Sequence, residues 1–273
     1  CVTLAWLKKC VKAGNKRSMS RQERRKQERL EKKQGKKEYK MEWELFQPWS
    51  VPVMKTTLPP DVLQTMIEIS DLIVADIDGA PFSSLPHSLP TELQYRLIEH
   101  NILEQTGVME FFLGAVRQFV IQCKCNMMPS NEEVFQREEW LTQMTRMWIV
   151  SQQPNEYSPV HVHAQCQISA VMYLKVPKIL PSKKEHRPID DGYIHFVGNA
   201  SRDIDLSVPL ISFPPQVGDF YIFGAHQQHG VYPYRCAEGQ KDTERRSVSF
   251  NTIFQTKADF DREQKYLQNE TKK

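Results

Sequence analysis

Three stretches near the end of the chain decide the fold: HVHAQCQISAVMYLKVP at 161–177, VGDFYIFGAHQQHGVYPY at 217–234 and ERRSVSFN at 244–251. Apolar and other residues alternate in the first and the third, and the second holds a run of aromatic residues, which is typical of strands. Each histidine group therefore adjoins a strand, and we expect these strands to form one barrel. The strands we predict are 147–150, 168–174, 220–223 and 247–254.

The histidines of these stretches are spaced like the ligands of one metal ion. His161 and His163 are separated by one residue, and side chains at i and i+2 of an extended segment lie on the same face. His229, 66 residues after His163, can complete a set of three and leave coordination positions open. Such a set suits Fe(II), Mn(II), Co(II), Ni(II) or a catalytic zinc. His226 competes with His229 for the third position, but the two would not share a strand face.

The order of the motifs resembles the Fe(II) and 2-oxoglutarate-dependent oxygenases. H-x-H precedes a strand ending in Tyr-Leu, and then come Gly-Asp with an aromatic strand, H-x-V-x-P and E-R-x-S-x-S-F-N. This order is similar to that of a branch common in marine bacteria and phages, and the resemblance covers residues 140–255. It implies a mainly β fold with supporting α-helices, namely a double-stranded β-helix (a cupin-like jelly roll).

The resemblance also implies the ligands of the metal. His161 takes the place of the first ligand, His163 that of the second and His229 that of the third. The superfamily usually has H-x-D/E at the first two positions, so His163 stands where a carboxylate is expected. A set of three neutral imidazoles remains compatible with Fe(II).

Arg245 and Ser247 stand where the family has the pair that binds the far carboxylate of 2-oxoglutarate. A guanidinium offers a carboxylate two parallel donors, and the i, i+2 spacing puts the serine hydroxyl on the same face. Tyr173 is expected to add a hydrogen bond, with a structural position in the barrel as the alternative. Arg246 would point to the opposite face, where we expect an exposed salt bridge.

The activity that the resemblance implies is oxidation of a substrate by O2 with conversion of 2-oxoglutarate to succinate and CO2, hydroxylation being the usual outcome. The substrate would be a small molecule or a protein side chain, and we expect Asn155, Tyr157 and His195 to contribute to its site. Two alternatives stay open. One is a cupin-like three-histidine metalloenzyme that does not use 2-oxoglutarate, and the other is a non-catalytic barrel that binds a ligand.

The charge of the chain divides it into two parts. Residues 1–40 contain 15 Lys or Arg and 4 Glu, and the rest contains 21 Lys or Arg and 29 Asp or Glu. We predict a basic, disordered tail that cannot bury enough apolar surface to fold, and Met19 with Ser20 resembles a natural start, which would place 1–18 upstream of it. Such a tail can attract nucleic acid, but a solvated role is favoured because no aromatic residues are interleaved from Ser18 to Lys37.

The remaining boundaries we predict are a single domain at 41–273, with helical support at 41–140, the barrel at 141–256 and a polar helix or tail at 257–273.

Several classes of protein are excluded by what the sequence lacks. It has no G-x-G-x-x-G or G-x-x-x-x-G-K-[ST] loop for phosphates and no G-x-S-x-G elbow for a nucleophilic serine. No stretch approaches the ~20 apolar residues of a membrane span. The six cysteines include no C-x-x-C pair, so we expect a soluble protein of the cytoplasm.

Overall fold

The computed structural model describes residue 25 and residues 52–75, 93–96, 102–181, 190–198 and 208–270. Residues 48–273 form one compact unit, and the fold below is that of this unit. The predicted tail at 1–40 lies outside the described residues, except for Arg25. The elements in chain order are β1 (Val53–Thr57), α3 (Pro60–Ala75), β2 (Leu93–Arg96), α4 (Ile102–Gln105), α5 (Val108–Met127), η3 (Pro129–Asn131), α6 (Glu132–Arg137), β3 (Trp140–Gln152), β4 (Ser158–His161), β5 (Ile168–Lys175), β6 (Ile194–Val197), β7 (Leu210–Phe213), β8 (Asp219–Gly224), β9 (His229–Val231), β10 (Arg245–Thr256) and α7 (Lys257–Glu270).

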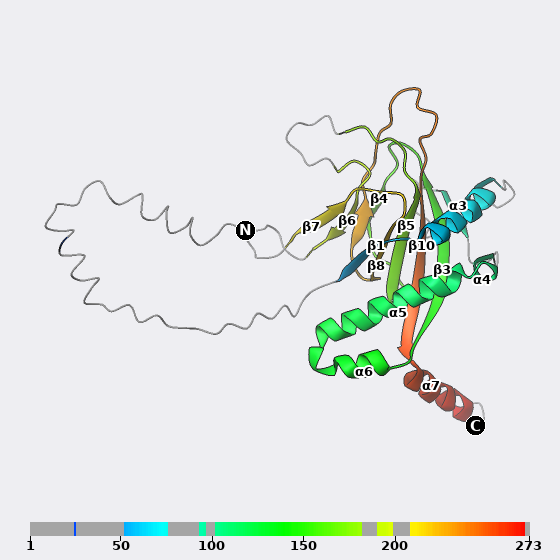
Figure 1. The fold of residues 1–273 in the computed structure, drawn as a ribbon, viewed down its shortest axis with the longest axis vertical. Coiled ribbons are helices and arrows are strands. Elements are labelled where there is room, and N and C mark those ends of the chain that lie inside the picture. The colour runs from blue at the N-terminus through cyan, green and yellow to red at the C-terminus, as the bar shows by residue number, and fades with distance from the viewer. Residues whose placement is uncertain are drawn as a thin grey trace. The chain divides into compact units, whose positions relative to one another are not determined.

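The strands form two antiparallel sheets (Figure 1). The larger has the order β1-β8-β5-β10-β3-β2 and the smaller the order β4-β9-β6-β7. From β3 onward the chain crosses repeatedly between the sheets, because β3, β5, β8 and β10 belong to the larger one and β4, β6, β7 and β9 to the smaller one. Eight strands wound in this way form a jelly roll. The predicted double-stranded β-helix is therefore confirmed.

All four predicted strands are present, and each is longer than its sequence pattern indicated. The segment 147–150 is the second half of β3, which begins at Trp140. β5 was expected to have one polar face, but every residue from Ile168 to Leu174 is buried. One face, with Met172, packs into the core beneath the helices, and the other, with Tyr173, faces the smaller sheet.

Helices α3 and α5 supply the apolar side chains that cover the outer face of the larger sheet (Figure 1). The helical pattern predicted at 109–123 is α5, and Phe112 in its second turn meets Phe220 of β8 and Phe250 of β10 at ring-centroid distances of 5.8 and 5.4 Å. Each ring buried in this way contributes about 1.5–3 kcal/mol. The support predicted at 41–140 is not helical throughout, because β1 and β2 from this segment join the larger sheet at its two edges.

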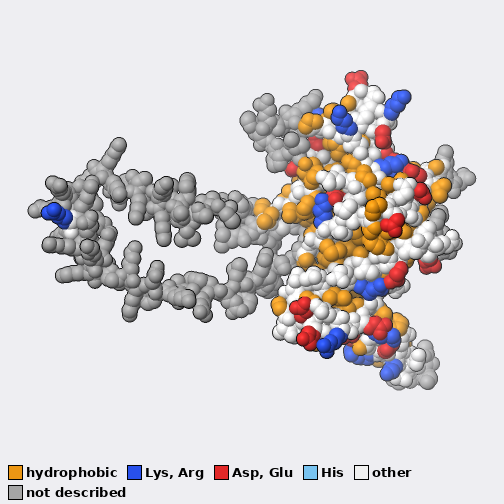
Figure 2. Space-filling view, in the orientation of Figure 1, with side chains coloured by type: hydrophobic (Ala, Val, Ile, Leu, Met, Phe, Trp, Pro, Cys, Tyr) orange, Lys and Arg blue, Asp and Glu red, His pale blue; other side chains and the backbone are white. Residues whose placement is uncertain are grey.

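The end of the described chain is the polar helix α7, and none of its side chains is buried. Charged side chains of both signs are interspersed over the face seen in the space-filling view (Figure 2). In the part of the chain that the structure describes, no helix is both long enough and apolar enough to span a membrane.

Candidate active site

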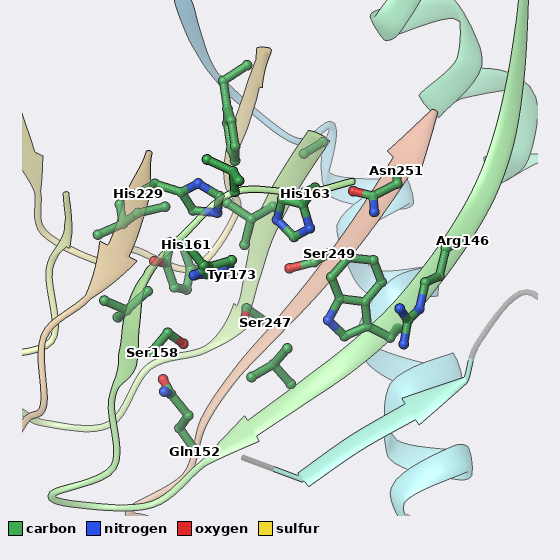
Figure 3. A pocket seen from close by; sticks show the side chains of 18 of the residues that line it. Arg146, Gln152, Ser158, His161, His163, Tyr173, His229, Ser247, Ser249 and Asn251 are labelled. Carbon is green, nitrogen blue, oxygen red and sulfur yellow. The ribbon is translucent and has the colours of Figure 1, made fainter. Parts of the chain in front are cut away.

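A cavity of about 550 Å³ opens between the two sheets (Figure 3). Its floor is built from β10, whose side chains at every second position line it, since successive side chains of a strand point to opposite faces. These residues are Arg245, Ser247, Ser249 and Asn251. β3 and β5 flank β10 on either side, and β4 and β9 of the smaller sheet close the cavity from above.

The three predicted histidines meet in this cavity. His161 ends β4 and His229 begins β9, and the two face each other in the antiparallel ladder. The possible ligand atoms of His161, His163 and His229 all lie within 4.8 Å of one another. His163, expected on a strand, lies two residues beyond the end of β4, where its backbone N–H donates to the carbonyl of Ala225 at 2.9 Å. That turn brings its ring to the other two without a shared strand face.

The protonation of the histidines suits metal binding. Burial, with the neighbouring histidines adding to it, lowers the pKa of His163 to about 3 and that of His229 to about 4. The Nδ1 atoms of His161 and His229 lie 2.7 and 2.8 Å from the carbonyl oxygens of Pro159 and Gln227. A carbonyl can only accept, so Nδ1 carries the proton and Nε2 keeps the lone pair that a metal needs.

Arg245 lines the cavity from the start of β10 and is 2% exposed. Its Nη1 donates to the carbonyl of Gly192 at 2.6 Å, and its guanidinium carbon lies 5.9 and 5.4 Å from the ring centroids of Tyr173 and Tyr234. Ser247 faces Tyr173 across the β10–β5 ladder, and both line the same cavity. The structure therefore brings the predicted anion-binding residues and the histidines to one cavity.

Arg246 points to the opposite face, as expected, but the expectation of an exposed salt bridge is wrong. The residue is 3% exposed. Its Nε and Nη2 donate to the two carboxylate oxygens of Glu244, each at 2.7 Å, and its Nη1 donates to Asp71 of α3 at 2.6 Å. Hydrogen bonding from Lys175, together with that from Arg246, lowers the pKa of Asp71. This network ties α3 to the larger sheet.

The three residues predicted to contact the substrate do not line the cavity. Asn155 and Tyr157 are exposed in the loop before β4. His195 is buried in β6, where its ring stacks on Tyr232 at a centroid distance of 4.2 Å, and burial lowers its pKa. His226 is also exposed and lies outside the histidine cluster.

Sequence reasoning missed four residues that line the cavity from β3: Arg146, Trp148, Val150 and Gln152. Along β3 these four residues alternate with buried residues. This alternation would have been visible in the sequence if the predicted strand had begun at Trp140. Asn251 and Ser249, at the end of the E-R-x-S-x-S-F-N stretch, also line the cavity.

Comparisons with known proteins give the class of this site. Residues 146–251 match the family model described as a putative 2OG-Fe(II) oxygenase. No curated protein matches the chain in sequence. This segment holds the three histidines and both arginines of the cavity, and its match indicates a 2-oxoglutarate and Fe(II)-dependent oxygenase, which is an oxidoreductase.

Several solved structures are similar to this chain. An oxidoreductase of the 2OG-Fe(II) oxygenase family from Burkholderia pseudomallei is 17% identical over 73% of this chain and 84% of that chain, with a TM-score of 0.39. A prolyl-4-hydroxylase from Pseudomonas putida is 14% identical over 73% and 91%, with a TM-score of 0.41. HygX from Streptomyces hygroscopicus, with nickel, 2-oxoglutarate and hygromycin B bound, is 10% identical over 74% and 82%, with a TM-score of 0.44.

Proposed function

We propose that this protein is a non-haem dioxygenase in which His161, His163 and His229 hold Fe(II), and that it belongs to the branch of the superfamily common in marine bacteria and phages. The observation that supports the ligand set most directly is the meeting of three imidazoles, with ligand atoms within 4.8 Å, in a cavity that also contains Arg245. The donor chemistry fits, because Fe(II) accepts neutral imidazoles and leaves further positions for a cosubstrate and O2.

Arg245, Ser247 and Tyr173 are the residues we assign to the far carboxylate of 2-oxoglutarate. Ser247 and Tyr173 lie opposite each other in the ladder, and the guanidinium of Arg245 lies beside the tyrosine ring. The ring of His163 lies 5.7 Å from that of Trp148, which faces Ser249, two residues further along β10 than Ser247. The cosubstrate would therefore lie along β10, with its far carboxylate at Arg245 and its keto acid end toward the histidines.

When bound, Fe(II) with 2-oxoglutarate would supply the oxidising chemistry, in which the substrate, O2 and 2-oxoglutarate yield the hydroxylated substrate, succinate and CO2. The contribution of the chain is to hold and orient the reactants in a cavity between two sheets. The lowered pKa values of His163 and His229 keep both imidazoles neutral at pH 7 and able to bind metal. The carbonyls of Pro159 and Gln227 orient the rings of His161 and His229.

The test is to purify the full chain without chelators under anaerobic conditions, to titrate it with Fe(II) and 2-oxoglutarate, and then to admit air and measure succinate. We expect one Fe(II) and one 2-oxoglutarate to bind, and His229→Ala to lose the metal. His226→Ala is the matched control, because this exposed histidine lies three residues away and outside the cluster. Equal metal affinity in both variants would refute the assignment of the ligands.

The same titration separates the alternatives. Metal binding without 2-oxoglutarate binding would indicate a cupin-like three-histidine enzyme, and binding of neither would indicate a non-catalytic barrel. We also propose a reducing compartment such as the cytoplasm. Its support is that the four cysteines of the described residues, Cys123, Cys125, Cys166 and Cys236, are free thiols.

A further inference from the structure

The cavity continues past the histidines to a second arginine. β3 and β10 run antiparallel along its floor, and their register pairs Gln152 with Arg245 at one end and Arg146 with Asn251 at the other. All four side chains line the cavity. In the close-up view, Arg146 and Gln152 lie at opposite ends of the part of β3 that lines the cavity, with the histidines above the strand (Figure 3).

One cosubstrate molecule cannot occupy both ends. Arg146 and Gln152 are six positions apart along β3, which at about 3.4 Å a position is roughly 20 Å. The four carbon–carbon bonds of 2-oxoglutarate, at about 1.5 Å each, span at most ~6 Å. A 2-oxoglutarate bound at Arg245 therefore leaves the Arg146 end of the cavity to another molecule. In an oxygenase that molecule is the substrate.

The walls at this end suit a small organic anion. The guanidinium carbon of Arg146 lies 5.2 Å from the ring centroid of Trp148, a geometry that holds the planar group in one orientation. The amide of Asn251 faces it across the ladder, and Gln165 also lines the cavity. The volume of about 550 Å³ falls within the range of small-molecule sites.

The charge of the filled cavity supports the same conclusion. Among its described lining residues are two arginines and no aspartate or glutamate. An H-x-D/E site would supply one negative charge, which this chain lacks because His163 replaces the carboxylate. The described lining of the cavity therefore contains basic side chains and no acidic ones.

On these grounds we propose that the substrate is a small organic acid and that Arg146 binds its anionic group beside Trp148. This inference rests on the proposed function, since it needs 2-oxoglutarate at Arg245. It assigns Arg146 to substrate specificity, and it leaves binding of the metal and the cosubstrate to other residues.

The test uses the full chain loaded with Zn(II), which is redox-inert, and saturated with 2-oxoglutarate. Benzoate and benzamide serve as probes, because they have nearly the same shape and differ in charge. Their dissociation constants are measured by ligand-observed NMR in the wild type, Arg146→Met, Arg146→Lys and Arg117→Met. Arg117 is the matched control, since it is a half-buried arginine of α5 that pairs with Glu110 and does not line the cavity.

We expect the wild type to bind benzoate at least about tenfold more tightly than benzamide, which is the lower limit for a hydrogen bond to a charged group. Arg146→Met should abolish the difference, Arg146→Lys should retain part of it and Arg117→Met all of it. Equal affinities in the wild type, or a preference that survives in Arg146→Met, would overturn the proposal. So would benzoate binding that is stronger in a parallel sample without 2-oxoglutarate than in the saturated one, because the probe would then compete for the cosubstrate site.

The proposed function is measured separately, by formation of succinate from 2-oxoglutarate with Fe(II) and no added substrate. Arg146→Met should keep this uncoupled turnover. Turnover without a preference for benzoate would refute the substrate class alone. A preference for benzoate without turnover would refute the dioxygenase and leave the anion site standing.

Discussion

Arg245 and Arg246 are adjacent in the chain, and we expect their replacement by methionine to affect different properties. Methionine keeps a flexible apolar stem and removes the charge. Arg246→Met should lower the free energy of unfolding and leave the affinity for 2-oxoglutarate unchanged. Arg245→Met should weaken 2-oxoglutarate binding and change stability little. The reason is that β10 turns the two side chains to opposite faces of the larger sheet.

The loss of stability in Arg246→Met follows from the contacts of its guanidinium. Removing one partner of a buried ion pair costs about 3–5 kcal/mol, because the other charge is left uncompensated. The side chain of Glu244 is only 18% exposed. It keeps a hydrogen bond from Ser151 at 2.7 Å, and Asp71 keeps Lys175 at 2.9 Å. These remaining partners place the expected loss near the lower limit, at about 3 kcal/mol.

The effect of Arg245→Met on the cosubstrate can be stated in the same way. A hydrogen bond to a charged group contributes about 1.5–3 kcal/mol, so the dissociation constant for 2-oxoglutarate should rise by roughly 10-fold to 150-fold. The substitution also removes the donor that Gly192 accepts from. This partner is a neutral carbonyl, and we expect a stability loss of about 1 kcal/mol.

Urea unfolding of the metal-free protein measures stability, and calorimetric titration of the Zn(II)-loaded protein measures 2-oxoglutarate binding. Arg137→Met is the control, because Arg137 is 82% exposed and its ion pair with Glu133 should contribute less than about 1 kcal/mol. A loss below about 1 kcal/mol in Arg246→Met would refute our reading of the network. A larger effect on 2-oxoglutarate binding at Arg246 than at Arg245 would show that the register of β10 is shifted by one residue.

Three further predictions concern pH, packing and the tail. The pKa values of His163 and His229, about 3 and 4, lie below the 6.5 of an unperturbed histidine. Below pH 6.5 the unfolded chain therefore binds more protons than the folded one. As pH falls from 6.5 to 4, the free energy of unfolding of the metal-free protein should decrease by up to ~1.4 kcal/mol per pH unit for each histidine. Urea titrations at pH 7, 6 and 5 measure this decrease. The prediction would be contradicted if the free energy of unfolding did not change with pH, or if it decreased as steeply in His229→Gln as in the wild type. Gly230→Ala should lower both thermal stability and metal affinity, since a Cβ there would lie 2.9 Å from the ring of His195 and 3.0 Å from the carbonyl of Ser158. Gly114→Ala in α5 is the control, because the nearest atom to its Cβ would be Nη2 of Arg117 at 3.7 Å, an ordinary contact. Deleting residues 1–40 should leave uncoupled succinate formation intact and remove only a salt-sensitive contribution to substrate capture. Loss of metal binding in the truncated chain would show that the domain boundary lies elsewhere.

Local signals were sufficient to predict β5, β8, β10 and part of β3, but not β4 and β9, the short strands that hold His161 and His229. Each histidine group adjoins a predicted strand, so its convergence with Arg245 followed once the predicted strands were assigned to one barrel. The position of His163 could not be derived in this way, because β4 ends at His161 and a turn held by Ala225 places the ring. The i, i+2 rule gave the right cluster for a different geometric reason.

Other features depend on partners that are distant in the sequence. Burial of Arg246 follows from Asp71, 175 residues earlier, and no local pattern indicates such a pair. The edge strands β1 and β2 are short and are assigned by their pairing with β8 and β3. Arg146 belongs to no motif, and its place in the cavity became visible when the ladder placed it opposite Asn251.

The position of β10 in the larger sheet has a consequence for synthesis of the protein on the ribosome. It is made after β3 and β5, yet it lies between these two strands and pairs with both. Until it emerges, each of those strands has an open edge facing the gap, and Asp71 of α3 lacks Arg246. Open edges of this kind can pair with other chains. The nascent chain is therefore expected to need protection from aggregation until β10 fills the gap in the sheet.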